Sequence, residues 1–294
     1  MLPFERKKEY LVCIDSDGTI MDTMTVKHEN CFGPMFIKAM DIKEHREEIL
    51  NHWLNVNLYT LTRGINRFQG FDEICHFIEN NYGGKIDGLD EFDAWLKTTK
   101  ELSMNALNAY RKNVKNDSLF EKAAQWSDMV NASIVSLPPS KTFDGVKGIL
   151  EKIHDEVDLV GVSSANREAV EEEWTRNHLM EYFRFVACQD KGIKALIIKN
   201  ALENGYAPEK TVMLGDALGD LNASKSNNVL FFPIIPKHET ESWKRFIDEA
   251  YPKLLSGTFD NEYQSIIIQE FLDSLKSSAD KQSNIIKKKR LIKS

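Results

Sequence analysis

Short apolar runs alternate with helix-like segments along the second half of the chain. The runs lie at 158–162, 183–187, 211–214 and 229–235, and a similar run at 10–14 lies near the N-terminus. Their lengths and polar flanks predict buried strands. Apolar spacing between the later runs predicts helices at 145–154, 167–178, 195–204 and 220–226. Because successive parallel strands need crossover connections, we expect an α/β fold with a Rossmann-like parallel sheet.

The segment between the first strand and the others has a different pattern. From residue 24 to about 134, apolar residues recur at helical spacing, and strand-like runs are lacking. One face is marked by Ile49, Leu50, Trp53, Leu54 and Leu58, and another by Phe92, Trp95, Leu96 and Leu102. The pair Pro138-Pro139 ends this stretch. We therefore expect an α/β core formed by residues 1–22 and 140–294, with an all-helical insert at 23–139.

A last amphipathic segment, at 263–275, carries Ile266, Ile267, Phe271 and Leu275 on one helical face. Such a face packs either on the core of the same chain or on a second subunit. The pattern leaves both arrangements open, and the chain is expected to be a monomer or a homodimer.

Composition limits location and partners. With 42% hydrophobic and 28% charged residues, usage is that of a globular protein. No apolar run approaches the roughly 20 residues of a membrane helix, and the N-terminus has no signal-like segment, so a cytoplasmic protein without a membrane partner is expected. A net charge of −7 argues against nucleic acid as a partner. The basic run at 287–290 is expected to be a solvated tail. Reduced core thiols are expected at Cys13, Cys31, Cys75 and Cys188.

Two aspartates follow the first apolar run, in the sequence Asp15-Ser16-Asp17-Gly18-Thr19. At the end of a strand, residues two apart project to the same side. One carboxylate can then attack a phosphate ester while the other transfers a proton, as acid for the leaving alcohol and as base for the water. The plainer interpretation is a turn rich in Asp and Gly.

A second acidic cluster, Gly215-Asp216-Ala217-Leu218-Gly219-Asp220, also follows an apolar run directly. Parallel strands open on the same edge of a sheet, so up to four carboxylates are expected to converge there. Crowded carboxylates beside a phosphorylated substrate indicate Mg²⁺, which prefers oxygen ligands. Asp216 is the stronger candidate ligand, because Asp220 also suits the acidic first turn of a helix.

Ser163 ends the apolar run 158–162, where its hydroxyl could hold a phosphate oxygen, and Ser164 is its rival. A serine at this place is also common as a turn or cap residue. Lys191 and Lys194 precede the helix that leads to Asp216, and either could supply the cation that offsets phosphate and carboxylate charge. At least one of the two lysines is expected to be solvated.

These residues, in this order, resemble the four motifs of the haloacid dehalogenase superfamily, with the continuation Ile20-Met21-Asp22-Thr23 also matching its first motif. The resemblance implies that the helical insert is a cap domain that chooses the substrate. It implies Asp15 as nucleophile and Asp17 as acid/base. It implies Asp15, the main-chain carbonyl of Asp17, and Asp216 as Mg²⁺ ligands, with Asp220 supporting the water shell of the ion. Lys194 is favoured over Lys191, because Gly192-Ile193-Lys194-Ala195 resembles the lysine-bearing helix start of the family.

The presence of Asp17 places the resemblance in the phosphatase and phosphomutase branch, because dehalogenases lack this residue. We therefore predict a Mg²⁺-dependent phosphatase of a small phosphorylated metabolite. A phosphomutase of the β-phosphoglucomutase type and a phosphonate hydrolase are the alternatives. In the insert, Arg63 and Arg67 flank a glycine, loosely like the cap loop by which mutases hold a second phosphate. Arg67 is the candidate substrate contact, and the competing interpretation is a pair of solvated arginines at a helix break.

Overall fold

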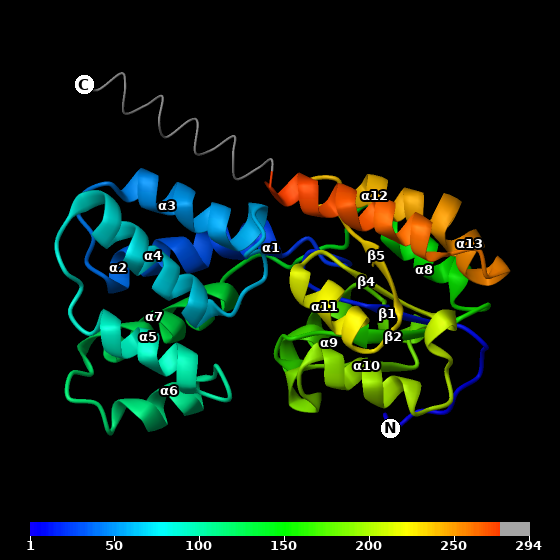
Figure 1. The fold of residues 1–294 in the computed structure, drawn as a ribbon, viewed down its shortest axis with the longest axis horizontal. Coiled ribbons are helices and arrows are strands. Elements are labelled where there is room, and N and C mark those ends of the chain that lie inside the picture. The colour runs from blue at the N-terminus through cyan, green and yellow to red at the C-terminus, as the bar shows by residue number, and fades with distance from the viewer. Residues whose placement is uncertain (277–294) are drawn as a thin grey trace, which may run out of the picture. The chain divides into compact units, whose positions relative to one another are not determined.

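The computed structural model describes residues 1–276. The basic run at 287–290 lies outside the described residues. The chain divides into two compact units (Figure 1). Of the described residues, 1–24 and 139–276 form the first, which we call the α/β unit, and 25–138 form the second, the helical unit.

The predicted parallel sheet is confirmed. Five strands lie in the order β3-β2-β1-β4-β5, and every neighbouring pair is parallel. The bounds are β1 Leu11–Ile14, β2 Asp158–Val162, β3 Phe185–Ala187, β4 Thr211–Gly215 and β5 Leu230–Pro233. The strands expected at 183–187 and 229–235 are shorter than predicted. Both are edge strands, and each ends where its backbone hydrogen bonds to its single neighbouring strand end.

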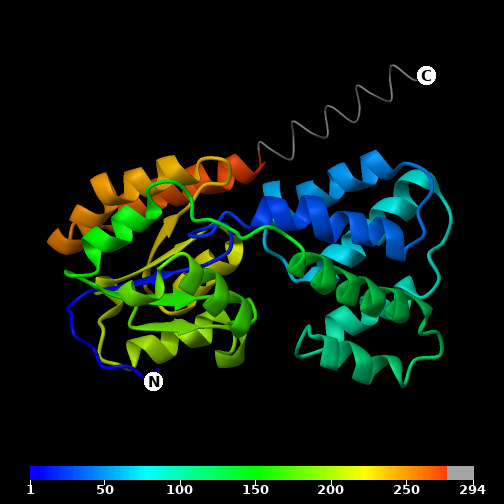
Figure 2. The same ribbon diagram turned by 180° about the vertical axis from the view of Figure 1, so that it is seen from behind.

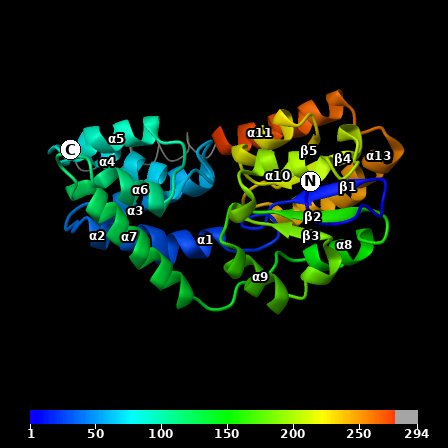
Figure 3. The same ribbon diagram turned by 90° about the horizontal axis from the view of Figure 1, so that it is seen from below.

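Helices cover both faces of the sheet, so its strands are buried on both sides (Figures 1 and 3). Val12 and Ile14 pack with helices α8, α9, α12 and α13, whereas Leu11 and Cys13 face the layer that contains α10 and α11. This two-sided burial explains why the strands read as continuous apolar runs. The bounds are α8 Val146–Ile153, α9 Arg167–Arg176, α10 Lys194–Leu202, α11 Leu218–Ser226, α12 Glu239–Arg245 and α13 Tyr251–Ser256.

The amphipathic segment near the C-terminus is helical over residues 261–276 and packs on the core of its own chain. Ile267 joins the hydrophobic cluster on one face of the sheet, and Phe271 and Leu275 join the cluster on the other. The side-chain oxygen of Gln264 accepts a hydrogen bond from the backbone amide of Phe231 in β5 at 2.7 Å. Ile267, Phe271 and Leu275 are thereby buried within the α/β unit, whereas Ile266, which was expected on the same face, is 51% exposed.

Every regular element of the helical unit is helical (Figure 2). Its core is rich in aromatic rings, with Trp53, Trp95 and Trp126 each at most 1% exposed. The bounds are α1 Met24–Lys27, α2 Gly33–Ala39, α3 Arg46–Leu54, α4 Arg67–Tyr82, α5 Leu89–Thr98, α6 Met104–Arg111 and α7 Ser118–Val135, with π-helical turns at His28–Phe32 and Asn55–Tyr59. This hydrophobic core is separate from the two that flank the sheet, so the helical unit buries its apolar residues within itself.

The four cysteines are buried and free, as the spacing predicted. Among residues 1–276, the helices are all too short or too polar to span a membrane.

Candidate active site

Strand register brings three of the predicted polar residues to one edge of the sheet. Ile14 at the end of β1 pairs with Gly161 of β2 on one side and with Leu214 of β4 on the other. Asp15, Ser163 and Asp216 therefore follow the ends of three adjacent strands. The carboxyl edge of a parallel sheet is where α/β proteins bind their ligands.

The turn after β1 is tightly folded. The carbonyl of Ser16 accepts hydrogen bonds from the amides of Thr19, Ile20 and Met21, and Gly18 has a φ of 78°, which favours glycine. Two tryptophans of the α/β unit anchor this turn from outside. The indole of Trp174 donates to the hydroxyl of Ser16 at 2.9 Å, and that of Trp243 donates to the carbonyl of Thr19 at 2.8 Å. The turn that carries the two aspartates is thus held from both of its ends.

Three carboxylates and one ammonium group meet at this edge. Asp15, Asp216 and Asp220 are 5%, 2% and 0% exposed, and each offers one oxygen within 4.8 Å of the others. Lys194 donates to Asp15 Oδ1 and to Asp220 Oδ1, both at 2.6 Å. Carboxylate oxygens at this spacing suit a hard divalent cation, so the donor set fits Mg²⁺.

Burial and the neighbouring charges both shift the pKa values of these groups. Burial raises the pKa of the Asp15 carboxyl, partly offset by Lys194, and burial likewise raises the pKa of Asp220. For Lys194, burial lowers the ammonium pKa, but the charges of Asp15 and Asp220 outweigh it and leave the pKa raised. Lys194 is therefore charged at neutral pH and places a positive charge beside both Asp15 and Asp220.

Asp17 is not one of the three clustered carboxylates. The hydroxyl of Thr23 donates to Asp17 Oδ1, and Thr23 is fully buried. Residue 17 also forms an isolated bridge with Met21 across the turn. The four carboxylates expected at this edge therefore separate into a cluster of three and a fourth that a hydroxyl orients.

Gly215, at the end of β4, allows Asp220 to approach the strand. A Cβ at this glycine would lie 2.2 Å from Asp220 Cγ, closer than any real contact. Asp220 Oδ2 accepts the amide of Ala217 at 3.1 Å, while its other oxygen accepts from Lys194. Asp220 is thus both an acid in the first turn of α11 and a partner of the lysine.

The alternatives that the sequence left open differ in their surroundings. Ser163 is 2% exposed, and its hydroxyl accepts the amide of Ala165 at 3.0 Å, whereas Ser164 is exposed. Lys191 lies 3.9 Å from Asp190 and its side chain is 40% exposed. Of the two lysines, Lys194 is the one in contact with the clustered carboxylates. Lys191 is solvated, as expected of one of the pair.

Arg67 lies in the helical unit, at the start of α4. Its guanidinium donates to Ser127 Oγ and to Asn131 Oδ1, both at 2.9 Å, and lies 5.3 Å from the centre of the Phe32 ring. Burial lowers its pKa. Arg63 is only 4% exposed and donates to the carbonyl of Leu58. The expectation of solvated arginines is therefore wrong for Arg63, because its guanidinium closes a turn inside the unit.

Several residues shape the site in ways that the sequence did not predict. Thr19 and Thr23 lie within the first motif but had no predicted role, and in the structure Thr19 donates to Asp15 Oδ2 at 3.4 Å and Thr23 donates to Asp17 Oδ1. Trp174 and Trp243 reach the turn from positions more than 150 residues away in the chain. Their spacing holds no local pattern from which this contact could be inferred.

The sequence matches the family model described as haloacid dehalogenase-like hydrolase over residues 65–234, more than half of the chain. This range contains Ser163, Lys194, Asp216 and Asp220 and begins after Asp15. No curated protein matches the sequence.

The solved structures that are similar to this chain include the following three. A haloacid dehalogenase-like hydrolase from Streptococcus pneumoniae is 14% identical, over 76% of this chain and 82% of that one, with a TM-score of 0.47. CbbY from Rhodobacter sphaeroides, in complex with phosphate, is 15% identical over 77% and 86%, with a TM-score of 0.45. A hydrolase of the same family from Xanthomonas campestris is 13% identical over 86% and 99%, with a TM-score of 0.44. Likenesses this distant carry no information on the substrate.

The match to the family model spans the strand ends that bear Ser163 and Asp216 and the helix that bears Lys194. Together with β1, which precedes the matched range and carries Asp15, these elements form the site described above. This chain therefore belongs to the haloacid dehalogenase-like hydrolases and is a hydrolytic enzyme.

Proposed function

We propose that the protein is a Mg²⁺-dependent phosphatase that hydrolyses a small phosphorylated metabolite through a phosphoryl group carried on Asp15. One observation supports this most directly. The Asp15 carboxylate is buried at the end of the central strand, and an ammonium group and two further carboxylates surround it. A carboxylate placed in this way is oriented for attack and is next to the positive charge that a phosphate requires.

The reaction divides into two displacements. A carboxylate oxygen of Asp15 attacks phosphorus, the bond from phosphorus to the substrate oxygen breaks, and the Asp17 carboxyl gives its proton to the departing alkoxide. In the second step Asp17 takes a proton from water, the resulting hydroxide attacks phosphorus, and the bond to Asp15 breaks. Inorganic phosphate leaves, and both aspartates return to their starting state. The hydrogen bond from Thr23 orients Asp17 for both proton transfers.

Asp15, Asp216 and the main-chain carbonyl of Asp17 would hold Mg²⁺, with Asp220 supporting its water shell. The fit rests on the chemistry of the donors, since Asp15, Asp216 and Asp220 offer buried carboxylate oxygens within 4.8 Å of one another, and oxygen is the ligand atom that Mg²⁺ prefers. When bound, the ion supplies the positive charge that lets a phosphate dianion approach these carboxylates. Lys194 carries the remaining compensation, and the hydroxyl of Ser163 binds a phosphate oxygen.

We propose further that the helical unit acts as a cap that selects the substrate. Its own compact core allows it to vary in sequence without disturbing the sheet. Within it, the partly desolvated guanidinium of Arg67 is the candidate contact for an anionic substrate group. Ser127 and Asn131 hold this guanidinium in place, so that little side-chain freedom would be lost on binding.

The test is phosphate release from a panel of phosphorylated metabolites, with Mg²⁺ and with excess chelator. We expect turnover only with Mg²⁺, and we expect Asp15→Asn to abolish it because an amide cannot form the acyl phosphate. Asp22→Asn is the matched control, since Asp22 is exposed in the same turn and should tolerate the change. Steady turnover by folded Asp15→Asn, or full activity in chelator, would contradict the proposal. Transfer of phosphate to another hydroxyl of the substrate, without release, would indicate a mutase instead.

A further inference from the structure

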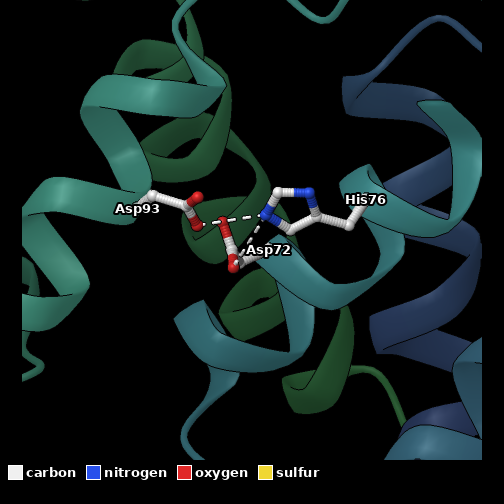
Figure 4. A group of neighbouring side chains, drawn as sticks. All are labelled: Asp72, His76 and Asp93. Carbon is white, nitrogen blue, oxygen red and sulfur yellow. Dashed lines mark hydrogen bonds and ion pairs between the residues drawn. The ribbon is translucent and has the colours of Figure 1, made fainter. Parts of the chain in front are cut away.

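A second group of ligand-type side chains lies in the helical unit, outside the site described above. Asp72 and His76 are one turn apart on α4 and so point to the same side of that helix. Asp93 comes from the neighbouring helix α5. Figure 4 shows the three side chains pointing toward one another from the two helices. Each offers one ligand atom within 4.8 Å of the others.

One carboxylate of this group lacks the partner that its burial demands. Asp72 is 8% exposed, and within residues 1–276 its buried Oδ1 has no hydrogen-bond partner. Its acidic neighbour, Asp93, can only accept when ionised. Burial, followed by the charge of Asp93, raises the pKa of the Asp72 carboxyl to about 7. Near neutral pH, a positive charge between the two carboxylates would therefore remove a substantial cost.

The separations within the group match those between ligands of one small cation. His76 Nε2 lies 3.1 Å from Asp93 Oδ1 and 3.7 Å from Asp72 Oδ2. Two ligands at tetrahedral angles around Zn²⁺, each about 2.0–2.1 Å from the ion, are about 3.3 Å apart. The observed distances lie on both sides of this value, so small side-chain adjustments would complete the geometry.

We propose that Asp72, His76 and Asp93 form a binding site for a divalent transition-metal ion, with Zn²⁺ as the best chemical match. An imidazole nitrogen combined with two carboxylates favours borderline cations over Mg²⁺, which prefers oxygen alone. The site is therefore chemically distinct from the all-carboxylate group at Asp15. Three protein ligands leave one tetrahedral position for water.

The position of the group suits a structural role. The three side chains connect α4 to α5, and these helices pack against each other through Phe71 and Phe92, whose ring centres are 5.6 Å apart. The His76 side chain is 39% exposed, which gives an ion access from solvent, whereas Asp72 is nearly buried. Lys97 lies 3.9 Å from Asp93 Oδ2 on the outer side and is 76% exposed, so it can move away at little cost. A bound ion would fix the distance between the two helices.

The test uses the full-length protein carrying Asp216→Asn, with Mg²⁺ in excess, so that zinc binding at the strand-end carboxylates is suppressed. Zinc chloride is titrated by calorimetry, and thermal unfolding is followed with and without it. We expect one zinc equivalent and a zinc-dependent rise in Tm. His76→Gln and Asp93→Asn should each weaken zinc binding by more than the roughly 10- to 100-fold typical of losing an outer-shell partner.

His52→Gln is the matched control, because His52 lies in the same unit and stacks on Phe77 with ring centres 3.9 Å apart. It should retain zinc binding. Asp72→Asn removes a carboxylate whose burial is unfavourable, so it should fold readily, raise the Tm of the zinc-free protein and lose the zinc-dependent rise. Absence of zinc binding, or binding by His76→Gln and Asp93→Asn within about 2-fold of the parent, would overturn the proposal. A rise in Tm by Asp72→Asn without any zinc effect in the parent would also overturn it, because a shared proton would then satisfy the group.

Discussion

Replacing Lys194 tests the electrostatic balance on which the site depends. Lys194→Met keeps most of the length of the side chain but removes the ammonium group. In the structure this group lies 2.6 Å from Asp15 Oδ1 and 2.6 Å from Asp220 Oδ1. Counting side-chain atoms alone, Lys194 is 15% exposed, Asp15 is 7% exposed and Asp220 is 0% exposed. Water cannot replace the lost charge at so buried a place.

Removing one partner of a buried ion pair typically costs about 3–5 kcal/mol, because an uncompensated charge remains. We expect Lys194→Met to lower the free energy of unfolding by about this amount. Lys191→Met is the matched control, since that lysine is 40% exposed and lies 3.9 Å from Asp190. An exposed pair contributes about 0–1 kcal/mol, so the two variants should differ clearly.

The pH dependence supplies a second readout. Without the lysine, burial raises the pKa of Asp15 and Asp220 in the folded protein further above the ordinary value of 3.8. A carboxyl with a raised folded pKa binds its proton more readily in the folded state, so its contribution is favourable at low pH and is lost as pH rises through the folded value. The deficit of Lys194→Met should therefore be smaller near pH 5 than near pH 8.

The measurement is urea unfolding of both variants in chelator, followed by circular dichroism at the two pH values. Adding Asp220→Asn to Lys194→Met should recover part of the lost stability, because the amide removes one of the two stranded charges. Losses by Lys194→Met and Lys191→Met that agree within about 0.5 kcal/mol would refute the reasoning, since exposed pairs contribute that little. A deficit that does not shrink in acid would refute it as well.

Two further predictions concern Asp17 and the strand end at Gly215. Asp17→Asn should slow hydrolysis of esters with poor leaving groups by about 10²- to 10⁴-fold but spare an activated aryl phosphate, and equal small losses on both substrates in steady-state assays would exclude an acid/base role. Gly215→Ala should destabilise the protein by at least about 1–3 kcal/mol through the clash with Asp220. Gly148→Ala, where the added methyl meets open space in α8, should instead stabilise it by about 0.5–1 kcal/mol. A shift of Tm in the same direction for both alanine variants, relative to the unsubstituted protein, would contradict this account.

Local pattern determined the elements of the α/β unit well. Strands buried on both faces are composed mainly of apolar residues, so β2 appears in the sequence with the bounds that it has in the structure. Its first residue, Asp158, is the polar exception, and its buried carboxylate pairs with Arg184 at 2.6 Å. The edge strands β3 and β5 were less predictable, because pairing with a single neighbour sets where they end. The aspartates at the strand ends could also be predicted from local pattern, because acidic residues that directly follow an apolar run mark the end of a buried strand.

The family resemblance favoured Lys194 over Lys191, but the contacts that distinguish the two lysines are seen only in the tertiary structure. Lys191 and Lys194 are three residues apart with similar neighbours in the sequence, yet Lys194 alone of this pair reaches Asp15 and Asp220. The direction of a long side chain depends on the packing of the helix that carries it, and residue type does not encode this direction. The same holds for the helix at 261–276, whose apolar face would suit either its own core or a second subunit.

The sequence by itself thus determined the fold class, the chain order of the strands and the family resemblance, because these follow from local periodicity and short motifs. Tertiary structure decided which distant side chains meet. Trp174 and Trp243 bind the turn at Ser16 and Thr19, and Asp93 of one helix meets His76 of another. These contacts join segments with no sequence relation to one another, and only the packing of helices and strands into layers brings them within hydrogen-bond distance.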